Sequence, residues 1–440
     1  MGFKVGLLGL GTVGAGTVQI LQTPDQRHPL LTELEIHKVG VRSLSKARDV
    51  SVPSSILTTD LASIVNDPEI DIIVEVMGGI EPARELILTA IANGKHIVTA
   101  NKALIAKHSD EIFSAAEKHG VYVLLEAAVG GGIPVIEPLK QSLCSNRIQS
   151  VMGIINGTTN YILTRMVNEG AEFADVLADA QRLGYAEADP TADVDGGDAA
   201  DKISILAALA FGGRVDRSQV SCEGIREVGR SEIAYAEKLG FVIKLLGIAE
   251  RSDSAPNTLA VRVHPTLLPK SHPLANVNDV YNAILVEGDP VGQVMFFGRG
   301  AGAGPTASAV TADLLNIAAL LKVGRDCAKQ ADGTPLLDPL LACAYRQEFA
   351  IAPLETLESK FYARFLTQDL PGVIGKLGTC FGDHHVSLES IVQADKRDGL
   401  AEIVVVTHVV KEGDFRSALA EIEQMNVLSS IASVLRVLPT

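Results

Sequence analysis

The sequence lacks the features that would mark a nucleic-acid-binding, membrane or secreted protein. No cluster of Lys and Arg offsets the formal net charge of −15, so nucleic acid is not an expected partner. The five cysteines are odd in number and form no C-x-x-C pair, which indicates a reducing compartment. The longest apolar stretch, near residues 203–213, is too short to cross a bilayer.

Internal repeats and low-complexity tracts are also missing, and an apolar segment begins at residue 3, which leaves no room for a signal peptide. A chain of 440 residues is long enough for two or three domains with a large core. We therefore expect a cytoplasmic metabolic protein with small-molecule ligands and no nucleic-acid or membrane partner.

A glycine-rich loop close to the N-terminus gives the first positive signal. Residues 3–8 are predicted to form a buried strand and residues 15–21 a helix. Gly9, Gly11 and Gly14 lie between them at the spacing G-x-G-x-x-G. The first glycine permits a tight turn, the second lets the backbone approach a pyrophosphate, and the third lets helix pack on strand. Because the helix N-terminus also offers N–H groups to phosphates, the loop predicts a dinucleotide site, with a structural turn as the alternative.

The end of the second predicted strand, residues 35–41, bears on the choice of cofactor. An NAD enzyme often has an acidic residue there, which binds the ribose hydroxyls. This chain instead has Arg42, Ser43, Lys46 and Arg48, whose charges and hydroxyl suit a 2′-phosphate. NADP is therefore favoured and NAD stays possible, since Arg42 and Lys46 could also be ordinary surface charges.

The alternation of strand and helix continues beyond this point. Further strands are predicted over residues 71–77, 96–99 and 121–125, and a helix over residues 81–93. Lys102 follows the second of these strands, and Glu126 follows the third. Ligands bind beyond the carboxyl ends of the strands in open parallel sheets, so we expect Lys102 to be functional.

Residues 184–202 hold the most distinctive pattern, with five aspartates, one glutamate and one lysine directly before an apolar helix expected over residues 203–211. Gly196 and Gly197 break the chain, and Asp195 is predicted to cap the helix. Asp198 and Lys202 then lie four residues apart on one helical face. A carboxylate and an amine beside a buried helix could bind a zwitterion and move a proton.

Two simpler interpretations of this segment compete with a catalytic one. An Asp–Lys pair at this spacing is usually a solvated contact that contributes ~0.3–0.5 kcal/mol. A calcium loop would need ligands at alternate positions, glycine sixth and glutamate twelfth, and residues 193–198 do not fit that pattern.

The same segment resembles the signature of the homoserine dehydrogenases. The matching residues are Ala180, Gly184 and Tyr185, followed by Asp189, Pro190, Asp193, Val194, Gly196, Asp198 and Lys202. Five more segments are similar to that family, namely residues 6–14, 99–102, 126–134, 156–163 and 298–310. The match covers most of residues 1–350, and one departure is Arg299, where the family pattern leads us to expect a proline.

The resemblance implies the reversible reduction of L-aspartate 4-semialdehyde to L-homoserine with NAD(P)H, in threonine, methionine and isoleucine biosynthesis. In that family the lysine matching Lys202 is the general acid/base, and the one matching Lys102 lies between cofactor and substrate. The carboxylates matching Glu187 and Asp198 bind the amino acid. We therefore predict Lys202, Lys102 and Asp198 as catalytic residues, and Glu187, Asp193 and Asp198 as substrate-binding residues.

The resemblance also implies where the cofactor and a cation bind. The predicted cofactor-binding residues are Gly9, Gly11, Thr12, Val13, Gly14, Arg42, Lys102, Gly184 and Gly302. A monovalent cation, sodium in that family, is expected near Glu126, Val129, Gly131 and Ile133, largely through backbone carbonyls.

Elementary chemistry supports these roles. Hydride addition to an aldehyde places negative charge on oxygen, which a nearby cation stabilises as it forms. A zwitterionic substrate needs an acid for its ammonium group, and Glu187 and Asp198 are available. The ten histidines are scattered, with His384 and His385 expected on a surface or turn, and no Ser–His–Asp order or metal-ligand cluster competes.

The C-terminal region is predicted to be a separate regulatory domain. Strands are expected over residues 361–365, 386–393, 402–410 and 433–438, with helices that open at residues 369–373 and span residues 414–425. This βαββαβ order, together with the D-x-P-G-V sequence from Asp369 to Val373, resembles an ACT domain, a ferredoxin-like fold that often binds an amino acid. Threonine feedback inhibition, with Asp369 and Gly372 near the effector, is the resulting hypothesis, and a vestigial ACT domain is its alternative.

We therefore expect an α/β protein with three domains. Residues 1–134, completed by about 304–324, form a Rossmann-type nucleotide-binding domain, and residues 135–303 an α+β catalytic and dimerisation domain of a homo-oligomer. Residues 325–357 form a connector, and residues 358–440 the ACT domain. The rival hypotheses are another amino-acid or aldehyde dehydrogenase on the same scaffold, and a non-catalytic ACT sensor of amino acids.

Overall fold

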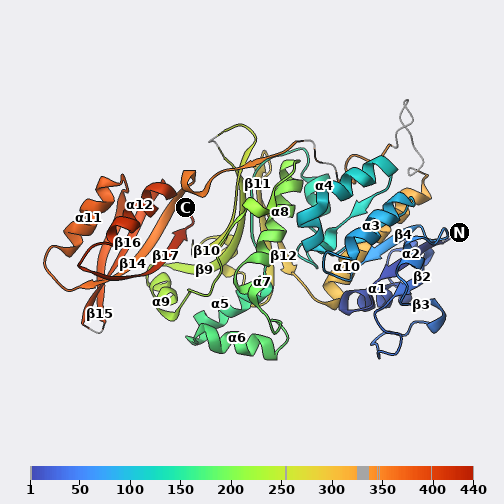
Figure 1. The fold of residues 1–440 in the computed structure, drawn as a ribbon, viewed down its shortest axis with the longest axis horizontal. Helices are drawn as coiled ribbons and strands as arrows, with labels where there is room; N and C mark the ends of the chain where they lie inside the picture. Colours follow the sequence, from blue (N-terminus) through green and yellow to red (C-terminus); the bar gives the residue numbers. More distant parts are fainter. Residues whose placement is uncertain are drawn as a thin grey trace. The chain divides into compact units, whose positions relative to one another are not determined.

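The computed structural model describes residues 2–252, 255–324, 336–343, 345, 347–397 and 399–439, without the side chains of residues 394–397 (Figure 1). The chain divides into two compact units. The first comprises Met1–Val151, Asp201–Ser218 and Tyr281–Phe349, and the second comprises Met152–Ala200, Gln219–Val280 and Ala350–Thr440. Of the predicted connector, residues 325–335, which include Gly333 and Pro335, lie outside the described residues.

The first unit contains a parallel sheet with the strand order β3-β2-β1-β4-β5-β6. Its strands are β1 (Phe3–Leu8), β2 (Leu34–Gly40), β3 (Leu57–Thr58), β4 (Ile72–Glu75), β5 (His96–Thr99) and β6 (Val123–Leu124). The helices between them are α1 (Thr12–Gln22), α2 (Ala62–Val65), α3 (Ala83–Ala92) and α4 (Lys102–His119). The order reverses between β1 and β4, as in a Rossmann-type fold, so a ligand is expected at the carboxyl ends of those strands.

The predicted strand over residues 71–77 is shorter in the structure, because β4 ends at Glu75. There the Glu75 carboxylate accepts hydrogen bonds from the backbone N–H groups of Met77 (2.9 Å) and Gly78 (3.3 Å), which turns the chain away from the sheet. The strand predicted over residues 121–125 is also shorter, since β6 spans only Val123–Leu124, whereas β1, β2 and β5 agree with the prediction within about one residue at each end.

Helix α10 (Ala303–Lys322) closes the core of the first unit from far along the sequence. Its residues Val310, Leu314 and Ile317 are fully buried with β1 residues such as Leu7. A Cβ on Gly16 of α1 would lie 2.7 Å from the carbonyl oxygen of Ala303, so glycine permits the close approach of the two helices. Helix α10 thus shares one hydrophobic core with the strands of the parallel sheet.

By length and composition α10 could cross a membrane, unlike the shorter apolar stretch considered from the sequence. Half of its residues are buried inside the protein, however, as in the core helix of a globular domain.

Three more strands lie side by side in the order β12-β11-β7, and of these β7 begins in the first unit and ends in the second. They are β7 (Arg147–Ile154), β11 (Tyr281–Asp289) and β12 (Gly292–Arg299). Helix α8 (Gly197–Phe211) contains the last residues of the signature at 184–202. Arg299, the departure from the family pattern, ends β12, and its guanidinium lies 5.6 Å from the centre of the Tyr281 ring.

The second unit is built on strands in the order β9-β10-β17-β14-β16-β15. They are β9 (Phe241–Arg251), β10 (Thr258–Pro269), β14 (Glu358–Gln368), β15 (Leu388–Arg397), β16 (Leu400–Lys411) and β17 (Leu428–Val437), and the short β8 (Ser221–Cys222) and β13 (Ala350–Ile351) also pair with β10. The helices are α5 (Gly157–Glu169), α6 (Phe173–Arg182), α7 (Thr191–Val194), α9 (Arg230–Lys238), α11 (Val373–Asp383) and α12 (Glu412–Ile422).

The part from β14 to β17 has the predicted βαββαβ order of an ACT domain. Its core contains stacked aromatic rings, with Phe361 and Phe415 4.1 Å apart between centroids. Pro371 lies before α11 and not in its first turn. Gly372 adopts a left-handed conformation (φ 87°) at the N-cap, so the helix begins only at Val373.

Candidate active site

The glycine-rich loop between β1 and α1 has the geometry of a phosphate-binding turn. Gly9 has φ 107°, and a Cβ on it would lie 2.9 Å from the carbonyl oxygen of Val76. A Cβ on Gly14 would lie 2.2 Å from the carbonyl oxygen of Gly9, so no side chain fits there. Gly11, by contrast, has no atom within 4 Å of its Cβ position, which leaves its backbone open to a ligand.

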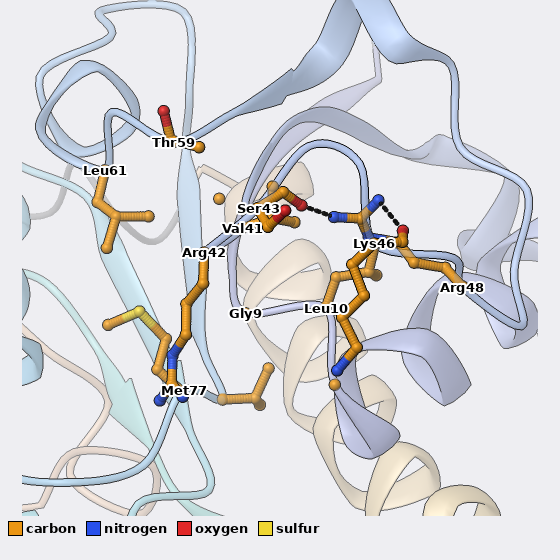
Figure 2. A pocket seen from close by; sticks show the side chains of 13 residues that line it. Gly9, Leu10, Val41, Arg42, Ser43, Lys46, Arg48, Thr59, Leu61 and Met77 are labelled. Atoms are coloured by element: carbon orange, nitrogen blue, oxygen red, sulfur yellow. Dashed lines mark hydrogen bonds between the residues drawn. The ribbon is translucent and has the colours of Figure 1, made fainter.

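This loop forms one wall of a pocket of about 530 Å³ at the carboxyl ends of β1 and β2 (Figure 2). Arg42, Lys46 and Arg48 also line the pocket, and no acidic side chain is among its lining residues. The Arg48 guanidinium is anchored by the carbonyl oxygens of Ser43 and Lys46, the latter at 2.8 Å. The predicted residues Gly9, Gly11 and Arg42 thus meet in one pocket, with Thr12 and Val13 following in the first turn of α1.

Lys102 is the first residue of α4 and is half-buried. The turn before it is fixed by Asn101, whose Oδ1 accepts from the N–H of Leu104 (3.2 Å) and whose Nδ2 donates to the carbonyl of Gly79 (2.6 Å). Thr99 joins this turn to the sheet, because its hydroxyl accepts from the Asn101 N–H (3.0 Å) and donates to Glu75 (2.8 Å).

Glu75, which we did not predict, is fully buried under this turn. Burial raises the pKa of its carboxyl, and hydrogen bonds from Thr99, Met77 and Gly78 act against that rise. The sequence signal for Glu75 is an acidic residue within an otherwise apolar predicted strand. Through Thr99 it helps to position the turn before Lys102.

Glu126 is buried, and its carboxylate accepts three backbone N–H groups, from Val135 (2.6 Å), Ile136 (2.9 Å) and Glu137 (2.7 Å). Burial raises the pKa of this carboxyl, while these hydrogen bonds oppose the rise. The Glu126 N–H in turn donates to Asp313 of α10 (2.9 Å). The carboxylate therefore holds the loop over residues 126–137 in one conformation.

The residues predicted to hold a cation form an oxygen-rich turn. A carboxylate offers about four lone-pair positions, and three of those on Glu126 accept N–H groups, so within the part of the chain that the structure describes one position remains on Oε2. Gly131 has φ 30°, and the turn packs closely against residues 299–305, since a Cβ on Gly131 would lie 2.6 Å from the Gly300 carbonyl oxygen. Val129 and Ile133 are buried beside it. One free carboxylate position with backbone carbonyls is a donor set that fits a hard monovalent cation.

In the second unit, Asn156 joins two carboxylates of the acidic segment. Its Nδ2 donates to Asp193 (2.7 Å) and to Asp198 (2.9 Å), while its Oδ1 caps α5 by accepting from the Thr159 N–H (2.8 Å). Asn156 and Asp198 are buried, and Asp193 is half-buried. Asn156 thus brings together two carboxylates that lie 37 and 42 residues after it in the sequence. Together they form an anionic site that suits an ammonium group.

Lys202 follows Asp198 by one turn of α8 and is half-buried. The predicted capping role of Asp195 is wrong, because its carboxylate pairs with the Arg226 guanidinium and it ends α7 instead. Gly196, with φ 83°, makes the break before α8, and a Cβ on it would lie 2.9 Å from the Cys222 sulfur.

The remaining predicted residues lie at the surface. Glu187 is exposed, and its backbone carbonyl accepts from Gln181 Nε2 (3.1 Å). Gly184 is exposed after α6 with φ 78°, and Gly302 is the exposed N-cap of α10 with φ 125°. Helix α10 packs on α1. Gly302 is the N-cap of α10, and the glycine-rich loop leads into α1.

Comparison with protein-family models gives three matches along the chain. Residues 9–126 match the model "Homoserine dehydrogenase, NAD binding domain", residues 134–315 match "Homoserine dehydrogenase", and residues 361–426 match "ACT domain".

Relatives and solved structures of the same description match over all or most of the chain. The chain is 63% identical to a homoserine dehydrogenase of Synechocystis sp. (strain ATCC 27184 / PCC 6803 / Kazusa) over 439 residues, 100% of both chains. It resembles the crystal structure of a homoserine dehydrogenase from Thiobacillus denitrificans with a TM-score of 0.89 and 43% identity, covering 100% of this chain and 98% of that one. A hyperthermophilic archaeal homoserine dehydrogenase solved with NADPH aligns with a TM-score of 0.62 and 28% identity, over 73% of this chain and 98% of that one.

Proposed function

The chain belongs to the homoserine dehydrogenase family, and we propose that it uses α8 to carry out the proton transfer in the reduction of L-aspartate 4-semialdehyde to L-homoserine. It is an NAD(P)-dependent oxidoreductase that acts on a CH–OH group. The observation that carries the mechanism is the position of Lys202 one helical turn after Asp198, whose carboxylate is paired with Asp193 through Asn156.

The reaction adds a hydride and a proton to the aldehyde carbonyl. The bound nicotinamide supplies the hydride, and Lys202 donates the proton to the oxygen as negative charge develops there. Asp198 and Asp193 accept hydrogen bonds from the substrate ammonium, with Glu187 as a third acid. Lys102, held by Asn101 at the start of α4, adds positive charge beside the reacting groups. Oxidation of L-homoserine, followed at the nicotinamide absorbance, tests this assignment.

We further propose NADP as the preferred cofactor. Three cationic side chains and no acidic side chain line the pocket beyond β2, which suits a 2′-phosphate. The relative solved with NADPH is consistent with this preference.

Replacing Arg42 with alanine should raise the KM for NADP by about 10- to 100-fold, since a hydrogen bond to a charged group contributes about 1.5–3 kcal/mol. The KM for NAD should stay within about two-fold, because NAD has no 2′-phosphate to lose. Steady-state kinetics with both cofactors checks this, and Arg27→Ala, an exposed arginine outside the pocket, is the matched control. An unchanged KM for NADP would show that Arg42 does not contact the cofactor.

For the cation, we propose sodium at the turn formed by Glu126, Val129, Gly131 and Ile133. The oxygen-only donor set and the one open position on Glu126 support this assignment. The cation would offset the cost of burying the Glu126 charge and would stabilise the loop conformation.

The ACT domain supports a proposal of feedback inhibition by L-threonine. A pocket of about 450 Å³ lies at the start of α11, lined by Thr367, Gln368, Asp369, Leu370, Pro371, Gly372, Val373, Ile374, Gln393, Ala401 and Ile403. Asp369 accepts from Gln393 Nε2 (3.3 Å), and a Cβ on Gly372 would meet no atom within 4 Å. A carboxylate and an amide beside an open glycine backbone suit a small polar amino acid.

A network of ion pairs offers a physical route from this domain to the acidic segment. Arg436 of β17 pairs with the fully buried Glu412 of α12 and, through both terminal nitrogens, with Glu223 at 2.8 and 3.0 Å. Burial raises the pKa of the Glu223 carboxyl, but hydrogen bonds and charge from Arg436 outweigh that effect and hold the pKa below its usual value. The next residue, Gly224, packs on the chain at Val194, where a Cβ would lie 2.1 Å from the carbonyl oxygen.

Replacing Glu223 with glutamine should weaken threonine inhibition by about 2- to 30-fold in the inhibitory concentration, because such coupling residues contribute about 0.5–2 kcal/mol. The amide keeps the shape of the side chain, so kcat without threonine should stay within about two-fold. Inhibition curves at fixed substrate measure this, with the exposed Glu227→Gln as the matched control. An unchanged curve would remove Glu223 from the route, and a wild-type enzyme insensitive to threonine would leave a vestigial ACT domain.

We also retain the three-domain division proposed from the sequence, with residues 1–134 and 304–324, 135–303 and 358–440 as domains. We propose further that the enzyme acts in the biosynthesis of threonine, methionine and isoleucine in the cytoplasm. We also propose that it assembles as a homo-oligomer.

A further inference from the structure

Three side chains of metal-ligating type meet where α11 and α12 of the ACT domain pack on each other. Cys380 lies in α11, His384 follows as its C-cap, and Glu421 lies in α12. One ligand atom from each residue lies within 4.8 Å of the other two. His384 Nε2 and Glu421 Oε2 are already 2.9 Å apart. The sequence prediction placed His384 on a surface or turn and did not connect it with the other two residues.

The spacing of the cluster follows from helix geometry. Residues four apart lie on the same face of a helix, so Cys380 and His384 present sulfur and imidazole side by side. Packing of α11 on α12 brings Glu421 to the same place, and the Cys380 thiol donates to the carbonyl of Ala418, one turn before it (3.6 Å). Thiolate, imidazole and carboxylate are the three ligand types that Zn²⁺ takes in proteins.

Solvent exposure increases from Cys380 through His384 to Glu421. Cys380 is 2% exposed, whereas the side chains of His384 and Glu421 are 28% and 56% exposed. A tetrahedral zinc site needs roughly 3.3–3.6 Å between its ligand atoms, as follows from metal–ligand distances of about 2.0–2.3 Å. The side chains of His384 and Glu421 are free enough to move by the small distance required, and a water molecule can serve as the fourth ligand.

The simpler interpretation is a buried cysteine beside a surface ion pair. Cysteine often behaves as a small apolar residue in cores, and His–Glu pairs are common at surfaces. Here, however, the thiol does not face apolar groups alone. The ligand atoms of His384 and Glu421 both lie within 4.8 Å of its sulfur. A cation bound among the three groups would take the place of the thiol proton.

We propose that Cys380, His384 and Glu421 form a Zn²⁺ site that ties α11 to α12. The opposite end of α11 borders the effector pocket through Val373 and Ile374. Zinc at the site fixes the helix at one end while the effector binds near the other, so the metal also stabilises the ACT domain. The zinc site does not rest on the proposed enzymatic function, since no residue of the catalytic site takes part.

The test is a Zn²⁺ competition titration on the metal-free full chain, with Co²⁺ absorption spectra to report a thiolate ligand. The expected result is one zinc per chain, a Co²⁺ spectrum with sulfur-to-metal charge transfer, and a zinc affinity at least about 100-fold weaker in Cys380→Ser and in His384→Ala. Cys144→Ser and His385→Ala are matched controls, because Cys144 is an exposed thiol and His385 is the adjacent histidine outside the cluster. Both controls should bind as the wild type does.

Two results would overturn the site. One is wild-type affinity for zinc in Cys380→Ser, and the other is a loss in Cys144→Ser, which would place the metal on another thiol. Homoserine oxidation should remain within about two-fold in every variant, so a failed zinc site and a failed enzyme assignment give different results.

Discussion

Replacing Lys202 with alanine should lower kcat for homoserine oxidation by about 10²- to 10⁴-fold, the usual contribution of a general acid/base. The variant loses the group that exchanges a proton with the substrate oxygen, whereas the phosphate-binding loop lies elsewhere in the sequence and is unchanged. The KM for NADP should therefore stay within about two-fold. Steady-state kinetics and NADPH binding by fluorescence measure the two effects separately.

A matched control is Lys322→Ala, which removes a lysine that pairs with Glu33 at the end of α10. This variant should retain full activity. If Lys202→Ala kept the wild-type kcat, or lost activity only together with NADPH binding, Lys202 would not be the proton donor.

The second large effect concerns a buried ion cluster in the second unit. The Arg364 guanidinium in β14 pairs with Glu402 of β16 and with Glu232 of α9, and Tyr235 donates to Glu402. The three charged residues are only 4–5% exposed. Replacing Arg364 with leucine leaves two buried carboxylates without their cation, so we expect a loss of about 3–5 kcal/mol in the free energy of unfolding. Urea unfolding followed by circular dichroism measures it.

The control replaces all three charged residues with apolar ones, as Arg364→Met, Glu232→Leu and Glu402→Leu together. Buried ion clusters replaced as a whole are often neutral or stabilising, because no charge is left without a partner. The triple variant should therefore be at least as stable as the wild type within about 1 kcal/mol. Wild-type stability in Arg364→Leu alone would show that the two carboxylates are solvated or protonated.

The parts of the site that follow one another in the chain could be predicted from the sequence. The glycines at positions 9, 11 and 14 sit where strand, turn and helix require them, and Asp198 and Lys202 are spaced by one turn of a single helix. The ACT strands and helices likewise follow from local alternation, because each element is formed by neighbouring residues.

What could not be predicted depends on contacts between distant segments. Asn156 reaches Asp193 and Asp198 across 37 and 42 residues, and Arg364 reaches Glu232 across 132. No periodicity in a single sequence indicates such pairs. Asp195 looked like a helix cap because its local context allowed it, but Arg226, 31 residues away, binds its carboxylate.

The ACT domain shows the same limit at the level of the sheet. Its strand β17 pairs in parallel with β10 at Thr266 and Leu267, so the sheet continues into the second unit's other strands. A strand pattern defines which residues are extended but not which edge receives another strand. The sequence therefore predicted the strands of the ACT domain but not the pairing of β17 with β10.

The most direct test of the central claim is the oxidation of L-homoserine by the purified full chain, with NADP and NAD in parallel and with and without L-threonine. The structure leads us to expect turnover with both cofactors, a lower KM for NADP, and inhibition by threonine. A protein that binds NADPH but turns over homoserine with neither cofactor would contradict the assignment and favour the non-catalytic sensor.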